Sequence, residues 1–170
     1  MTIHTDHPFR DPSPDPVRQL RGRLGGAVSL WTAPGPAGLT VSSFLVAAGE
    51  PSYVVGLLDP DSDLWAAVEE NGTVVVQLLP WRQRGLAEAF AGTGPAPGGP
   101  FAQAEFTSTR WGPRLAAAET WAGAALESSR PVGWSVLVTC VVEHVEIGED
   151  DVVLHRRGRY LRPRPDARAP

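Results

Sequence analysis

The chain has 170 residues, 42% of them hydrophobic, and its 18 glycines and 17 prolines are typical of one β-rich domain with many turns. All 15 basic residues are arginine, which excludes a lysine Schiff base and a lysine-bearing phosphate loop. The net charge of −4 gives no general attraction to nucleic acid, and no apolar run is long enough to cross a membrane.

Residues 1–19 are predicted to form a flexible arm, because Pro12, Pro14 and Pro16 alternate with polar residues. His4 and His7 in this arm lack a fixed third ligand, so we interpret them as solvated and expect no metal site. The arm has no apolar core behind a basic start, so it is no export signal and a cytoplasmic protein is expected. At the other end, residues 163–170 are interpreted as a solvated tail rich in arginine and proline.

The domain between these ends, residues 20–162, is predicted to be mainly β with a few short helices. Blocks rich in valine and threonine indicate strands, and capped apolar patterns indicate helices. The expected strands are residues 27–32, 39–47, 53–58, 73–79, 118–128, 132–147 and 152–161; the expected helices are 17–24, 64–70 and 83–91. Residues 92–100 are rich in glycine and proline and predict an exposed loop.

The segment from Gly38 to Ser43 carries an unusual row of hydroxyl groups. In an extended strand Thr40 and Ser42 point to one side, whereas Leu39 and Ser43 point to the other. Such a row beside backbone amides suits an oxygen-rich ligand. The alternative is a half-exposed strand whose hydroxyl groups contact water.

Ser62 precedes the predicted helix at residues 64–70. A serine at a helix N-terminus suits a phosphate group, because unpaired amides and the helix dipole favour an anion. The alternative is a plain N-cap, and Asp59, Asp61 and Asp63 disfavour phosphate by repulsion.

Two buried positions carry polar or reactive groups. Gln77 interrupts an apolar strand and requires a hydrogen-bond partner, either backbone or ligand. Cys140 is the only cysteine, so it forms no internal disulfide, and its apolar neighbours predict a buried and unreactive thiol. The sequence shows no convincing Ser-His-Asp, Cys-His or paired-carboxylate site, so no catalytic residue is assigned.

Four blocks, in the same order, resemble the flavin reductase family of FMN-binding split β-barrel proteins. The resemblance covers about residues 20–161. The four blocks are Gly38-Leu39-Thr40-Val41-Ser42-Ser43-Phe44, Ser62 to Trp65 with Val74 to Leu79, Gln83-x-x-Leu86-Ala87-x-x-Phe90-Ala91-Gly92, and Leu154-His155-Arg156-Arg157-Gly158-Arg159-Tyr160.

The resemblance implies a Greek-key split barrel that works as a homodimer. It further implies FMN as cofactor, with FAD or riboflavin as alternatives, and NAD(P)H as co-substrate. A flavin-dependent monooxygenase is an implied partner, and neither nucleic acid nor a membrane is expected. By resemblance the cofactor-binding residues are Thr40, Val41, Ser42, Ser43, Ser62, Leu64, Gln77, Gln83 and Phe90.

Three features depart from the family pattern. The triplet Gly133-Trp134-Ser135 stands where many members have Gly-Asp-His, Gln77 replaces an asparagine, and Asp61 and Asp63 lie near the expected phosphate. Our first hypothesis is an NAD(P)H:flavin oxidoreductase. The missing Asp-His pair motivates the alternative of a flavin-binding protein without turnover, for storage, sensing or delivery. A third alternative is a barrel that binds haem or a deazaflavin.

Overall fold

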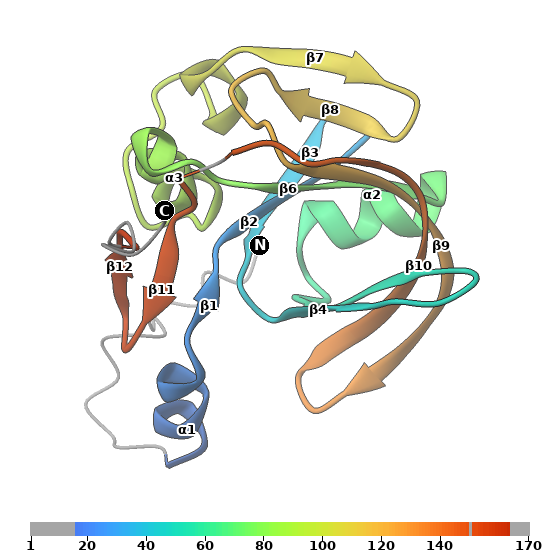
Figure 1. The fold of residues 1–170 in the computed structure, drawn as a ribbon, viewed down its shortest axis with the longest axis horizontal. Coiled ribbons are helices and arrows are strands. Elements are labelled where there is room, and N and C mark those ends of the chain that lie inside the picture. The colour runs from blue at the N-terminus through green and yellow to red at the C-terminus, as the bar shows by residue number, and fades with distance from the viewer. Residues whose placement is uncertain (1–15, 150, 164–170) are drawn as a thin grey trace, which may run out of the picture.

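The computed structural model describes residues 16–149 and 151–163 (Figure 1), so His4 and His7 lie outside the described residues. Helix α1 (Pro16–Leu24) confirms the predicted lead-in helix and begins inside the stretch expected to be a flexible arm. Figure 1 shows α1 extending from the body of the protein, next to the turn between strands β11 and β12. Among the described residues, no helix combines the length and the apolarity needed to span a bilayer.

A curled antiparallel sheet of seven strands forms the body and confirms the mainly-β prediction. Its strand order is β3-β2-β6-β9-β10-β5-β4. The two edge strands, β3 and β4, follow each other in the chain with only Ser42 and Ser43 between them, so the sheet curls into an incomplete barrel. The strands are β2 (Ser29–Ala33), β3 (Ala37–Val41), β4 (Phe44–Ala47), β5 (Tyr53–Leu58), β6 (Thr73–Leu78), β9 (Trp121–Val132) and β10 (Ser135–Glu146).

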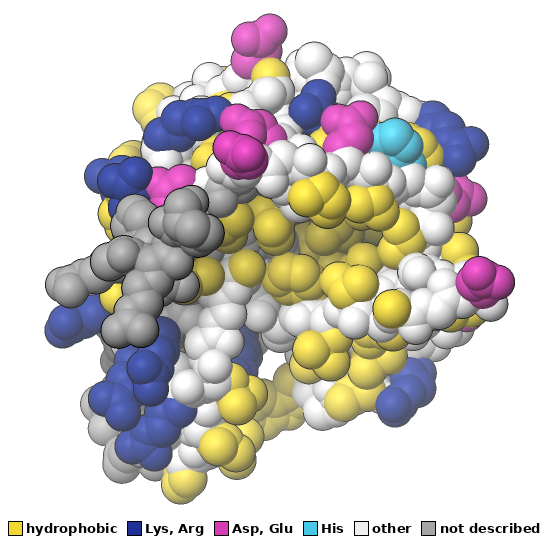
Figure 2. Space-filling model, viewed as in Figure 1, with side chains coloured by type: hydrophobic (Ala, Val, Ile, Leu, Met, Phe, Trp, Pro, Cys, Tyr) yellow, Lys and Arg dark blue, Asp and Glu magenta, His cyan; other side chains and the backbone are white. Residues whose placement is uncertain are grey.

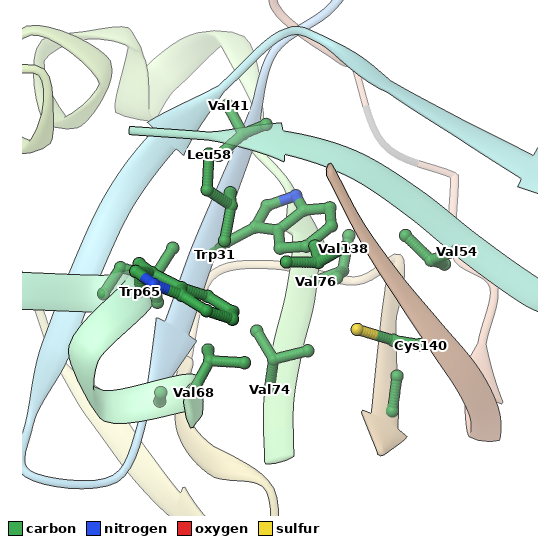
Figure 3. Close-up of a cluster of buried hydrophobic side chains, with 13 residues drawn as sticks. Trp31, Val41, Val54, Leu58, Trp65, Val68, Val74, Val76, Val138 and Cys140 are labelled. Atoms are coloured by element: carbon green, nitrogen blue, oxygen red, sulfur yellow. The ribbon is translucent and has the colours of Figure 1, made fainter. Parts of the chain in front are cut away.

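Helix α2 (Asp63–Asn71) packs its apolar face into the curl of this sheet. Figure 3 shows Trp65 and Val68 from α2 directed at Val74 and at the indole ring of Trp31. Gly56 makes the dense packing possible, because a Cβ there would lie 2.6 Å from the Trp31 ring. The core is therefore inside the barrel, and ligands must approach from its rim or its outer surface.

Smaller elements cover the outside of the sheet. Strands β1 (Gly26–Ala27), β11 (Leu154–Arg156) and β12 (Arg159–Leu161) form a second sheet, and β7 (Phe106–Thr109) pairs with β8 (Gly112–Leu115). A second apolar cluster lies beneath helix α3 (Arg84–Phe90), beside the short 3-10 helices η1 (Trp81–Gln83) and η2 (Pro100–Gln103).

Three predicted strands are corrected by the structure. The expected strand 39–47 is β3 and β4, interrupted at Ser42–Ser43 because the chain crosses from one sheet edge to the other. The expected strand 152–161 is the hairpin β11–β12, and strand β10 begins at Ser135 rather than at Val132 because Gly133 and Trp134 form a turn. Strands β7 and β8 were not predicted.

Candidate functional site

The crossing between β3 and β4 places hydroxyl groups at the surface. Ser42 is exposed, and the Ser43 hydroxyl donates to the Leu57 carbonyl at 3.3 Å. Because β3 is an edge strand, one row of its backbone amides and carbonyls lies outside the sheet ladder. The crossing thus offers neutral donors and acceptors close together.

Thr40 has a structural contact rather than a free hydroxyl group. Its Oγ1 donates to the Ala87 carbonyl of α3 at 2.8 Å. The same helix packs closely on β3 because Gly38 has no side chain. A Cβ at this position would lie 2.7 Å from the Phe90 ring. These contacts fix α3 next to the hydroxyl segment, so Thr40 positions the site instead of presenting its hydroxyl group.

Ser62 is the N-cap of α2, as the alternative interpretation proposed. Its Oγ accepts from the Trp65 amide at 3.1 Å and donates to the Asp59 carbonyl at 2.7 Å. Asp61 and Asp63 are exposed beside it. The carboxylates make this helix end unfavourable for an anion, despite the helix dipole.

Gln77 has only protein partners, although the resemblance implied a cofactor contact. Its amide donates to the Thr32 hydroxyl at 3.0 Å, and its Oε1 accepts from the Leu115 amide at 2.6 Å. These two hydrogen bonds tie β8 to the main sheet. The side chain is 0% exposed, so it has no surface that a ligand could contact.

The predicted site residues therefore divide into two groups. The side chains of Val41, Leu64, Gln77 and Phe90 are buried and shape the walls. Five residues retain exposed surface, and they lie on β3, at the β3–β4 crossing, at the N-cap of α2 and at the end of η1: Thr40, Ser42, Ser43, Ser62 and Gln83. None of these nine side chains is a strong acid or base, which suits a site where a bound cofactor supplies the chemistry.

A cleft of about 740 Å³ lies on the outer side of α3, and sequence reasoning missed it. Its lining comes from two distant segments: Trp81, Arg82, Arg84, Gly85 and Glu88 from η1 and α3, and Gly158, Arg159 and Tyr160 from the β11–β12 hairpin. The sequence feature that could have indicated this cleft is the pair of arginines, Arg82 and Arg84, on either side of Gln83. The resemblance directed attention to the glutamine between them.

The structure also describes the surroundings of Cys140, of the metal-ligating side chains and of Trp134. Cys140 is fully buried, which confirms the predicted burial, and desolvation raises the pKa of its thiol to about 12. Within residues 16–149 and 151–163, no group of three or more metal-ligating side chains is close enough to hold a metal ion. Trp134 is 93% exposed at the tip of the β9–β10 hairpin, so it does not pack within its own chain.

Comparison with known proteins identifies the family. Residues 21–163 match the flavin reductase like domain. The chain belongs to this family. A similar relative is an FMN reductase (NADH) RutF 1 of Methylorubrum extorquens, 31% identical over 148 residues that cover 84% of this chain and 73% of the relative.

Two solved structures illustrate the fold that this chain shares with known proteins. The Streptomyces globisporus C-1027 NADH:FAD oxidoreductase SgcE6, in complex with NAD and FAD fragments, has a TM-score of 0.80 at 21% identity, covering 89% of this chain and 93% of that one. A homologue of nitrilotriacetate monooxygenase component B from Mycobacterium thermoresistibile has a TM-score of 0.80 at 22% identity, covering 91% and 88% of the two chains. These neighbours establish the flavin reductase fold.

Proposed function

We propose that this flavin reductase family member transfers hydride from NAD(P)H to flavin, with FMN as the bound flavin. The observation that carries the proposal is the hydroxyl segment at the β3–β4 crossing, which the family match covers. A bound flavin supplies the redox chemistry, and the protein supplies binding, orientation and exclusion of water.

The residues at this crossing fit a flavin. The pyrimidine edge of the ring both donates and accepts hydrogen bonds, and it needs neutral partners of both kinds. Ser42, Ser43 and the free backbone row of edge strand β3 provide them. Thr40 would hold α3 beside the ring through Ala87, and Gln83 at the start of α3 is half-buried with a side chain available to a ligand.

The proposal includes a homodimer, which the exposed hydrophobic side chains of this chain support. Leu45 and Val46 of β4 are 73% and 68% exposed, and Trp134 projects from the hairpin tip. Figure 2 shows hydrophobic side chains lining a hollow in the region of β4 and β10. A second copy would cover this surface and add its own residues to the flavin site.

A monooxygenase that consumes the reduced flavin is the partner we propose. The similarity to a monooxygenase component B homologue supports this role. We also infer a cytoplasmic location, because the reaction depends on a supply of reduced nicotinamide nucleotide.

The decisive experiment mixes purified protein with FMN and either NADH or NADPH and follows the nicotinamide absorbance. We expect flavin-dependent oxidation of at least one nucleotide. No flavin-dependent oxidation of either nucleotide above the rate without protein would remove the proposal.

The alternative of flavin binding without turnover is favoured by Gly133-Trp134-Ser135, which places no titratable side chain at the hairpin tip. It predicts a yellow protein that dithionite bleaches and neither nucleotide does. The absorption spectrum of the purified protein distinguishes both functions from a haem or deazaflavin protein.

A further inference from the structure

The positive charge of this protein is concentrated in α1 and the second sheet. Residues 16–27 and 152–163 together contain seven of the 15 arginines, and neither segment contains an aspartate or a glutamate. Because the whole chain has a net charge of −4, all other residues together carry −11 (−4 less +7). The fold brings the two segments together where β1 pairs with β11. A mainly acidic protein therefore has one strongly basic surface.

Five of these arginines are exposed and form no ion pair with any described residue. Arg162, in contrast, is paired with Asp151 at 2.6 Å. Figure 2 shows Lys and Arg side chains, in dark blue, gathered in the region of α1 and the β11–β12 hairpin, with hydrophobic side chains exposed next to them. We call the five exposed residues the arginine face: Arg21, Arg23, Arg156, Arg157 and Arg159.

Helix α1 adds an exposed row of aliphatic side chains to this surface. Val17, Leu20 and Leu24 are 72%, 62% and 77% exposed. Their spacing of i, i+3 and i+7 places them on one side of the helix. We call these three residues the aliphatic ridge, and their exposure shows that the rest of the chain does not cover them.

The opposite side of α1 is held against the β11–β12 hairpin. The Arg157 amide donates to the Gly22 carbonyl at 2.8 Å, and a Cβ on Gly22 would lie 3.8 Å from the Arg157 Cα. Because each residue advances about 100° around a helix, the aliphatic ridge lies about 140–160° from Gly22 and points away from the hairpin. Arg21 and Arg23 lie about 100° to either side of Gly22 and thus flank the ridge.

We propose that α1 and the arginine face bind the surface of an anionic phospholipid membrane, with the aliphatic ridge inserted at the headgroup level. A helix with leucines on one side and arginines beside them suits this interface, because the aliphatic groups leave water while the guanidinium groups contact lipid phosphates. Nucleic acid would leave the ridge without an apolar partner. Valine and leucine seldom dominate the affinity of protein–protein interfaces, which favours lipid over a protein groove. The contact is peripheral, so it requires no membrane-spanning segment.

Co-sedimentation of the purified full chain with lipid vesicles tests this proposal. We expect binding to vesicles of phosphatidylcholine mixed with phosphatidylglycerol, weaker binding as salt increases, and no binding to phosphatidylcholine alone. Arg23→Gln and Arg159→Gln should each weaken binding about fivefold, and Leu24→Gln about tenfold. The matched controls are Arg130→Gln, at an exposed position of β9, and Ile147→Gln, at a position 78% exposed outside the ridge. Near-ultraviolet circular dichroism of each variant verifies the fold.

The proposal is overturned if the wild-type protein does not bind the anionic vesicles, or if the two controls lose as much affinity as the test variants. A loss in the arginine variants but not in Leu24→Gln would contradict insertion of the ridge, because it indicates only a general attraction between charges. If Leu24→Gln instead lowers the mass measured by light scattering, a second copy of the chain covers the ridge and the membrane assignment is wrong. Vesicle binding is measured without flavin or nucleotide, so its outcome is independent of the proposed function.

Discussion

Gln77 shows how a single buried amide can be mistaken for a ligand contact. We expect Gln77→Ala to lower the free energy of unfolding by about 2–4 kcal/mol, because it leaves a cavity and an unpaired amide on Leu115. Gln83→Ala is the matched control: it should change stability by less than about 0.5 kcal/mol and weaken FMN binding instead. Urea unfolding and FMN titration of both variants measure the two effects. Equal destabilisation by both would contradict this assignment.

His155 predicts a pH dependence that is local to the second sheet. Burial, and secondarily the charge of Arg21, lower the pKa of this imidazole below its ordinary value of 6.5. The unfolded chain therefore binds more protons, so the contribution is fully present above about pH 6.5 and is lost as the pH falls toward the lower folded pKa. We expect the urea midpoint to decrease over this range, and the decrease to be smaller in His155→Gln.

Glu146 provides an internal control for that measurement. Hydrogen bonds from Trp121 and His144 lower the pKa of its carboxyl group, so its contribution is lost only as the pH falls below its ordinary value of 4.5. If the urea midpoint depends equally on pH between pH 5 and 7 in the wild type and in His155→Gln, the proposed contribution of His155 to the pH dependence of stability is contradicted.

At the scale of elements, the β7–β8 hairpin packs on the sheet through one close approach. A Cβ on Gly123 of β9 would overlap the ring of Trp111, which donates to the Glu143 carboxylate at 2.7 Å. We expect Gly123→Ala to destabilise the protein by about 1–3 kcal/mol, because the ring must move. Gly26→Ala is the control, since a Cβ on Gly26 meets no atom within 4 Å. Thermal unfolding compares the two, and a similar loss in both would show that the ring contact is not responsible.

At the scale of the whole molecule, strand β4 is incomplete in a single chain. Consecutive residues of a strand point to opposite faces, so the exposure of both Leu45 and Val46 leaves both faces of this edge strand uncovered. We expect Val46→Asp to shift the mass in solution from dimer to monomer and to weaken FMN binding, with little change in the fold of the chain. Val46→Ala should remain a dimer. Light scattering measures the mass, and a monomeric wild-type protein would contradict the proposed dimer.

The sequence by itself determined the family, the mainly-β class and the burial of Cys140, because these depend on local patterns and on motifs whose order along the chain is preserved. It also indicated the hydroxyl segment near Ser42. Only the tertiary structure decided which polar groups are already paired, as for Thr40 and Gln77, because their partners lie 47 and 45 residues away along the chain. The cleft, likewise, exists only where the fold brings Arg84 of α3 against Tyr160 of β12. A hydrogen-bonding group looks the same in a sequence whether a ligand or a distant part of the chain satisfies it.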